Sequence, residues 1–155
     1  MKLTTRSRYG TRLLLDIAMH SEEGRPVPSK DTAEREGLSL KYLEKLIKML
    51  KQAGYVKGKR GPNGGNMLVR KPEEISIGKV AQVLDGEEHV YGCDADVSIC
   101  SRAAVCLKRS IWDDASNAMY KMLDSYSLAD LMKDASLCPH ENLDQLKVVD
   151  PDDVS

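Results

Sequence analysis

Three cysteines lie within one fourteen-residue segment, CDADVSICSRAAVC, which spans residues 93–106. Cys93, Cys100 and Cys106 are separated by six and five residues. Thiolates are soft ligands, so a loop that brings them together could hold zinc, another soft metal or an iron–sulfur cluster. The gaps are wider than the short Cys–Cys spacing of structural zinc sites, which disfavours zinc. On the residues alone, an iron–sulfur cluster, zinc, a thiol–disulfide switch and inert thiols all stay open.

The chain shows no sequence signal for a membrane or for secretion. No apolar run approaches the roughly 18 residues that cross a bilayer, and MKLTTRSRYG at the start lacks the apolar stretch of a secretory signal. We therefore expect a cytoplasmic protein without a membrane partner. Structural disulfides are rare in that compartment, so clustered cysteines indicate metal or redox chemistry. No Cys-x-x-Cys pair occurs, and we expect neither an enzyme nor a small-molecule substrate.

Charge divides the chain into two unlike halves. Residues 1–78 carry 16 basic and 9 acidic side chains, which leaves a net charge of +7. Residues 79–155 carry 7 basic and 15 acidic side chains, which leaves −8. A basic half beside an acidic half indicates that a polyanion such as DNA contacts the first half only.

Apolar spacing predicts three helices in the basic half. The first covers residues 3–20. The second, KDTAERE, is expected to have Ser29 as its N-cap and to stop at Gly37. The third, LKYLEKLIKMLKQA, follows an N-cap at Ser39 and ends at Gly54. Two short helices joined by a tight turn, with a basic exposed face on the second, form a helix-turn-helix pattern.

The third helix has two contrasting faces. One is an apolar stripe for the core, formed by Leu40, Leu43, Ile47 and Leu50. The other carries side chains suited to base edges and phosphates in a major groove, which is about 12 Å wide. The DNA-contacting residues predicted at this helix are Ser39, Lys41, Tyr42, Glu44, Lys45 and Lys48.

The segment YVKGKRGPNGGNMLVR follows directly and predicts a β-hairpin wing. Its strands are expected at residues 55–57 and 67–69, around a tip at 60–65. Arg60 on this narrow tip can reach a minor groove, where the negative potential attracts a guanidinium group. Phosphate contacts, which position a protein on DNA without reading its sequence, are predicted for Arg6, Lys48, Lys57 and Lys59.

The acidic half predicts helices that join two copies of the chain. IGKVAQVLDG should form a helix with Ser76 as its N-cap and Gly86 at its end. A helix of about 24 residues with an apolar stripe is expected from Arg102 onward, and a short helix, LADLMKDA, after Ser127. The long helix cannot be buried within a chain of this size. We therefore expect it to pack against its copy in a homodimer.

These elements predict a mainly α fold with a small β-hairpin wing. We expect a winged helix-turn-helix DNA-binding domain over residues 1–78, and a cysteine loop with dimerisation helices over 79–135. Residues 136–155, which end in VVDPDDVS, should form a disordered acidic tail.

Several stretches resemble the IscR-type winged-helix transcriptional regulators, an Rrf-type family that also includes NsrR and CymR. The resemblance covers residues 1 to about 135 and is carried by MKLTTRSRYG, LSLKYLEKLIKMLKQAGYV, RGPNGGNMLVRKPEEISIGKV, the three spaced cysteines and LKRSIWDDAS. It implies a homodimer that binds operator DNA, with base reading around Lys41–Lys45 and minor-groove contact by Arg60. It also implies that Cys93, Cys100 and Cys106 hold an iron–sulfur cluster.

The fourth ligand of such a cluster departs from the family pattern. The resemblance implies a histidine at position 109 for a [2Fe–2S] cluster, or an acidic residue near position 8 for a [4Fe–4S] cluster. Both positions are arginines here, and a guanidinium group stays protonated and cannot ligate. Three thiolates suit a [4Fe–4S] cluster with one open iron better than a [2Fe–2S] cluster. The other candidates are a non-protein ligand or His89, Asp94, Asp96, Cys138 and His140.

Together these features predict a sequence-specific, DNA-binding transcriptional regulator whose operator affinity is set by the cluster, as a sensor of redox state, nitric oxide or iron–sulfur status. Two alternatives stay open. One is a cluster-free or thiol–disulfide-switched regulator of the same fold. The other is a winged-helix interaction module that does not bind DNA.

Overall fold

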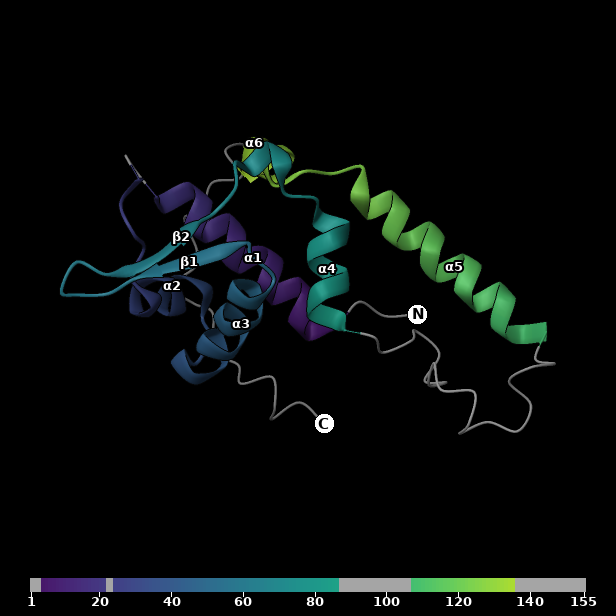
Figure 1. Cartoon of the computed structure of the whole chain (residues 1–155), viewed down its shortest axis with the longest axis horizontal. Coiled ribbons are helices and arrows are strands. Elements are labelled where there is room, and N and C mark those ends of the chain that lie inside the picture. Colours follow the sequence, from purple (N-terminus) through teal and green to yellow (C-terminus); the bar gives the residue numbers. More distant parts are fainter. Residues whose placement is uncertain (1–3, 22–23, 87–106, 136–155) are drawn as a thin grey trace.

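The fold is mainly helical with one two-stranded hairpin, as the sequence predicts (Figure 1). The structure is a computed structural model that describes residues 4–21, 24–86 and 107–135. Strands β1 (Val56–Lys59) and β2 (Gly65–Leu68) pair antiparallel. No helix within these ranges is long and apolar enough to cross a bilayer. The helices are α1 (Thr5–His20), α2 (Ser29–Glu36), α3 (Leu40–Gln52), the 3-10 turn η2 (Pro72–Glu74), α4 (Ile77–Asp85), α5 (Leu107–Asp124) and α6 (Leu128–Ala135).

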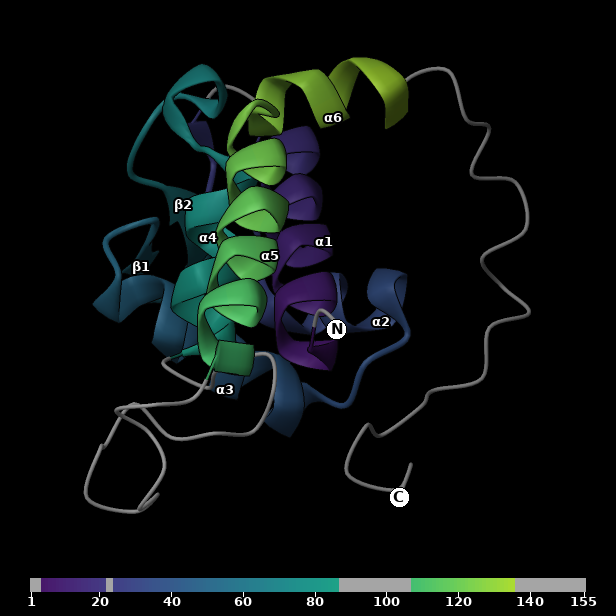
Figure 2. The same cartoon turned by 90° about the vertical axis from the view of Figure 1, so that its right-hand side faces the viewer.

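Helix α1 is the central element of the described fold. Helices α2 and α3 and the hairpin lie on one side of it, and α4 lies on the other (Figure 1). Helix α6 also contacts α1, whereas α5 packs on α4, and Figure 2 shows α5 in front of α4. Helix α4 also contacts α3 directly, so a change in the position of α4 or α5 is connected to the helix-turn-helix both through α1 and through this contact.

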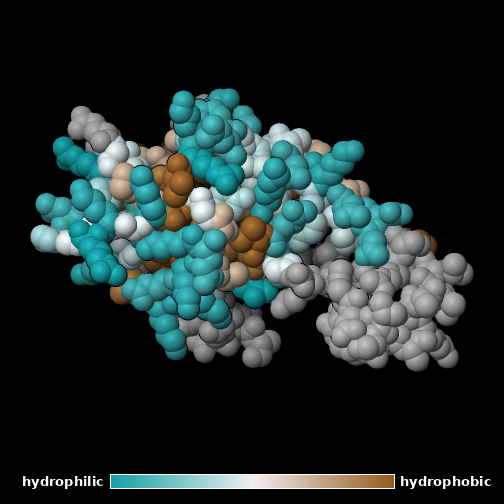
Figure 3. Space-filling view, viewed as in Figure 1, coloured by the Kyte–Doolittle hydropathy of each residue, from teal (hydrophilic) through white to brown (hydrophobic). Residues whose placement is uncertain are grey.

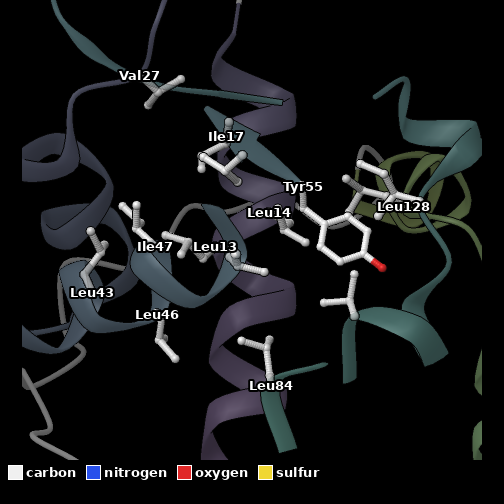
Figure 4. Close-up of a cluster of buried hydrophobic side chains, with 14 of the residues drawn as sticks. Leu13, Leu14, Ile17, Val27, Leu43, Leu46, Ile47, Tyr55, Leu84 and Leu128 are labelled. Carbon is white, nitrogen blue, oxygen red and sulfur yellow. The ribbon is translucent and has the colours of Figure 1, made fainter. Parts of the chain in front are cut away.

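The hydrophobic core lies between α1, α3, the hairpin, α4 and α6 (Figure 4). Side chains from both predicted domains contribute to this core. The domain boundary expected at residue 78 stays a prediction. Its fully buried large residues include Leu13, Leu14, Ile17, Leu43, Leu46, Leu50, Ile75, Val80, Leu84 and Leu128.

Most helix ends agree with the predicted capping residues. The Ser39 hydroxyl accepts a 3.3 Å hydrogen bond from the Tyr42 N–H at the start of α3. Ser76 accepts an equivalent 3.3 Å bond from the Lys79 N–H at the start of α4. Gly37 (φ 63°) and Gly54 (φ 75°) follow α2 and α3 in the left-handed region, which glycine adopts without strain.

The prediction that Ser29 caps α2 was wrong. Pro28 occupies the N-cap and Ser29 is the first residue of the helix. The Ser29 hydroxyl instead accepts a 2.9 Å hydrogen bond from Nδ2 of Asn66, a buried residue of β2. Ser29 therefore joins α2 to the hairpin.

Three residues of α3 also differ from the predicted pattern. Leu40, expected in the core, is 44% exposed because it is the first residue of α3, and Leu46 is the fully buried residue that the predicted stripe omitted. Tyr42, expected on the exposed face, is only 6% exposed. Its ring packs edge-on against Tyr9 with centroids 6.1 Å apart. Tyr9 of α1 thus covers a flank of α3 that periodicity assigned to solvent.

The hairpin and the long helix have bounds different from those expected. Strand β1 begins one residue later than predicted, and β2 begins two residues earlier. Residues 60–64 are left as the tip. The helix expected from Arg102 is described from Leu107 as α5, and its earlier residues lie outside the described ranges. The predicted tail at 136–155 also lies outside them.

Candidate nucleic-acid interface

The outward face of α3 carries four of the residues predicted to contact DNA. Lys41, Glu44, Lys45 and Lys48 are all exposed. Ser39 is half-buried at the N-cap, where its hydroxyl is used by the backbone. The α3 face is therefore basic and accessible, with one carboxylate in its middle.

An ion pair between a buried carboxylate and a half-buried arginine positions α2 against α1. Asp16 of α1 is 5% exposed, and its carboxylate accepts hydrogen bonds from Nε and Nη2 of Arg35 at 2.6 and 2.9 Å. The hydrogen bond to Asp16 raises the pKa of Arg35. Nδ1 of His20 lies 3.2 Å from the same carboxylate. Because the fork of Arg35 meets both oxygens, it sets the orientation as well as the distance of α2.

A second chain of contacts links α2 to α3 through α1. Arg12 lies 2.8 Å from the Glu36 carboxylate, and its guanidinium group lies 5.5 Å from the centre of the Tyr9 ring. Burial raises the pKa of Glu36, and the neighbouring Arg12 opposes that effect. Tyr9 in turn packs on Tyr42 of α3. These contacts hold the two helices of the helix-turn-helix at a defined angle.

The hairpin is joined to the start of α2 by its backbone. The Val27 N–H donates to the Asn66 carbonyl at 2.9 Å, and the Asn66 N–H donates to the Val27 carbonyl at 2.7 Å. A Cβ on Gly65 would lie 2.3 Å from the Val27 carbonyl oxygen, so only glycine permits this approach. The wing is therefore held directly beside α2 and α3.

Two adjoining cavities of about 390 and 420 Å³ form a groove between the hairpin, α2 and α3. They share Ser29 and Lys51, so we treat them as one feature, the basic groove. Hydrophilic side chains cover the hairpin end and α3 in Figure 3. The basic groove is lined by Ser29, Glu44, Ile47, Lys48, Lys51, Gln52, Gly58, Lys59, Arg60, Gly65 and Asn66.

The predicted residues divide between three places. Lys48, Lys59 and Arg60 line the basic groove, and Lys41 and Lys45 lie on the exposed face of α3. Lys57 is exposed on β1. Arg6 lies elsewhere, because its Nη2 donates to the Asp85 carbonyl at 3.2 Å.

Sequence reasoning missed Lys51 and misassigned Ser29. Lys51 follows Glu44 and Lys48 at helical spacing, a signal that places it on the same side of α3. The role of Ser29 had no such signal, because its partner Asn66 lies 37 residues away.

The cysteines and the other candidate ligands lie outside the described residues. These are Cys93, Cys100, Cys106 and Cys138, with His89, Asp94, Asp96 and His140. Within the described part of the chain, no group of three or more His, Cys, Asp or Glu side chains could hold a metal. Arg8 is exposed on α1, and Arg109 belongs to α5.

The last residue of α4, which precedes the cysteine segment, is a buried carboxylate. Asp85 is 3% exposed and accepts hydrogen bonds from the Thr4 hydroxyl and, at 3.0 Å, from the Tyr120 hydroxyl. Burial and the bond to Asp85 raise the pKa of Tyr120 to about 12. This cluster joins the start of α1, the end of α4 and α5.

Replacing Tyr120 with phenylalanine should lower the free energy of unfolding by about 1–2 kcal/mol, because a buried carboxylate loses a donor. The raised pKa means that this contribution is complete below pH 10 and is lost as the pH rises toward about 12. Urea unfolding of both proteins from pH 7 to pH 11 measures the difference. Tyr126→Phe is the matched control, since Tyr126 is 45% exposed. A difference unchanged up to pH 11 would contradict this assignment.

Comparison with known proteins then places the chain. Residues 3–134 match the profile of the Rrf2 family, described as iron-dependent transcriptional regulators. The chain belongs to the Rrf2 family. It is 55% identical over 139 residues to protein rrf2 of Nitratidesulfovibrio vulgaris, covering 90% of this chain and 92% of that one. It is 42% identical over 134 residues to the regulator IscR of Aliivibrio salmonicida, covering 86% and 79%.

Solved structures of Rrf2 proteins share the fold. IscR from T. potens superposes with a TM-score of 0.68 at 38% identity, covering 87% of this chain and 88% of that one. CymR, the global cysteine regulator of B. subtilis, gives 0.66 at 31% identity, covering 86% and 97%. The protein is therefore an IscR-type transcriptional regulator with the winged-helix fold of the Rrf2 family, and not an enzyme.

Proposed function

We propose that this Rrf2 protein binds operator DNA as a homodimer and that an iron–sulfur cluster on Cys93, Cys100 and Cys106 sets its operator affinity. The observation that supports DNA recognition best is the basic groove, which continues from the exposed face of α3 to the wing. Its cations Lys48, Lys51, Lys59 and Arg60 have no carboxylate ion-pair partner among the described residues. Unpaired cations along a groove suit a polyanion.

Each element has a distinct proposed role on the duplex. Helix α3 enters the major groove, where Ser39, Lys41, Glu44 and Lys45 meet base edges and nearby phosphates. Arg60 at the wing tip enters the adjacent minor groove. Lys48 and Lys59 contact phosphates. Tyr42 acts from inside the fold, by holding α3 against Tyr9.

A homodimer is supported by the apolar outer side of α5. Ile111 is 65% exposed, Met122 is 59% exposed, and Ala118 between them is also exposed. Their spacing of seven and four residues places them on one face of the helix. Such a face is stabilised by packing against its copy, and a two-fold dimer would read a pseudo-palindromic operator.

The cluster assignment rests on the donor set and the family. Three thiolates suit an iron–sulfur cluster, and the Rrf2 profile describes iron-dependent regulators. The cluster would supply chemistry that responds to oxidants, and a [4Fe–4S] form with one open iron suits three cysteines. CymR relatives, one of them solved in an oxidized form, make a thiol-based switch the alternative.

The position of the cysteine segment in the sequence supports this coupling. It follows α4 and precedes α5 in the chain. Asp85 at the end of α4 is hydrogen-bonded to Thr4 at the start of α1 and to Tyr120 of α5, so α4 contacts both other helices there. A change in cluster state would shift the balance between two arrangements of these helices and so move the two copies of α3.

Protein purified without oxygen should be brown and contain iron and sulfide at about four each per chain. The Cys93→Ala, Cys100→Ala, Cys106→Ala triple variant should lack both and should differ from the holo protein in operator affinity. Cys138→Ala should retain the iron unless Cys138 is the fourth ligand. Equal operator binding by holo protein and triple variant would sink the coupling, and a metal-free wild type with reductant-dependent binding would favour the thiol switch.

A further inference from the structure

The middle of the basic groove contains a lysine that the hairpin leaves room for. A Cβ on Gly58 would lie 2.7 Å from Nζ and 3.3 Å from Cε of Lys51, so the Lys51 side chain lies across β1 at that glycine. Gly58 pairs with Asn66 in the hairpin. Because Gly58 has no side chain, the Lys51 ammonium group can lie directly against strand β1.

A hydroxyl donor lies in the same groove. Ser29 Oγ accepts a hydrogen bond from Nδ2 of Asn66, which leaves the Ser29 proton available to donate. Asn66 is 3% exposed and is bonded through its backbone to Val27, so this hydroxyl is firmly positioned. Ser29 and Lys51 line both cavities of the groove. A neutral donor and an ammonium group thus lie together at its centre.

The positive charge of this centre is reinforced from the wing. Lys59 and Arg60 line the same cavity of about 390 Å³ as Lys51 and Ser29. Three cations and a hydroxyl donor around a cavity of this size suit an anion with several oxygens. Glu44, the one carboxylate lining the groove, lines only the neighbouring cavity, toward the outer face of α3.

We propose, on the basis of the DNA binding proposed above, that this centre binds one backbone phosphodiester of the operator, with Lys51 as its main charge and Ser29 as a donor. The phosphodiester lies on the strand between the major groove that receives α3 and the minor groove that receives Arg60. This contact fixes the register between helix and wing, so one strand is held before either groove is read.

The test combines protein variants with single neutral phosphates. A duplex selected from a random pool by the wild-type protein is made with one methylphosphonate at each backbone position in turn. Each is bound to wild type, Lys51→Gln, Gly58→Ala and the control Lys79→Gln, which is exposed on α4. Neutralising one phosphate per half-site should lower the DNA affinity of wild type and of Lys79→Gln about fivefold. The DNA affinity of Lys51→Gln should fall less than about twofold.

Gly58→Ala separates the ammonium position from folding. The added methyl meets the flexible end of Lys51, so the fold and its unfolding transition should be retained while DNA affinity falls as in Lys51→Gln. In Lys51→Gln, the slope of log binding constant against log salt concentration should also become shallower by about 0.9 for each phosphate contact that is lost.

Three results would overturn this assignment. If no phosphate position couples to Lys51 while wild type still binds the duplex, the phosphodiester contact is wrong and DNA binding stands. If wild type broadens the phosphorus NMR resonance of inorganic phosphate and Lys51→Gln does not, while no phosphodiester position couples to Lys51, the site binds the free anion instead. If wild type binds no duplex at all, both proposals fail.

Discussion

Replacing Arg35 with alanine should lower the free energy of unfolding by about 2–3 kcal/mol, the largest single loss we expect from a charged residue of this protein. The reason is the Asp16 carboxylate, which is 5% exposed and would lose two hydrogen bonds of 2.6 and 2.9 Å. A buried carboxylate without its partner is costly. We place the loss below that of a fully buried pair because Arg35 itself is 32% exposed and solvent screens it.

Urea unfolding at neutral pH measures this loss, and two variants make it specific. Nζ of Lys30 lies 3.9 Å from the Glu34 carboxylate on the same helix, and both side chains are exposed. Lys30→Ala removes this pair and should change the free energy of unfolding by less than about 0.5 kcal/mol. Arg35→Lys keeps the charge but cannot donate from two nitrogens of a rigid fork, so its stability should fall between those of wild type and Arg35→Ala. Equal losses for Lys30→Ala and Arg35→Ala would show that the pair does not hold α2 on α1.

Replacing Gly78 with alanine should displace α5, with a cost of about 1–3 kcal/mol in the free energy of unfolding. A Cβ at position 78 would lie 2.6 Å from the Tyr120 carbonyl oxygen and 2.7 Å from the Asp124 backbone nitrogen. Backbone atoms cannot rotate away as a side chain can, so α5 as a whole must move from α4.

Because α5 carries the proposed dimer face, Gly78→Ala should also raise the dissociation constant of the homodimer by about tenfold or more. Sedimentation velocity over a concentration series measures this change, and Lys79→Ala, exposed on the same helix, is the control. A less stable variant that dimerises as tightly as wild type would argue that the copies meet elsewhere.

The sequence predicts the elements of this fold well where the signal is local. Ser39 and Ser76 cap the helices they were expected to cap, because the serine and its backbone donor are three residues apart. Gly37 and Gly54 end helices at the expected places for the same local reason. The hairpin follows from its glycine-rich tip, with its strands displaced by one or two residues.

Apart from Leu40 and Leu46 of α3, the errors concern residues whose position is decided by distant partners. Tyr42 lies beside the apolar stripe of α3, and its burial in the core includes an edge-on contact with Tyr9 of α1. Ser29 is engaged by Asn66 across the hairpin instead of by its own helix. Lys51 belongs to the groove because β1 has a glycine at position 58. None of these partners can be read from spacing within one helix.

The candidate site is predicted in part on the same grounds. Charge and periodicity place Lys41, Lys45 and Lys48 on one exposed face, and turn residues place Arg60 at the wing tip. The groove between them depends on the backbone contact between Val27 and Asn66, which no local pattern reveals.

Selection from a random duplex pool tests most directly whether α3 and the wing recognise a specific DNA sequence. The wild-type protein, prepared without oxygen, should enrich a pseudo-palindromic sequence whose half-sites are spaced by about one helical turn or a multiple of it. Lys45→Ala should relax the preference within each half-site, and binding should weaken steeply with salt. A pool that converges on no sequence, or one that converges equally for wild type and Lys45→Ala with little salt dependence, would contradict sequence-specific recognition by α3.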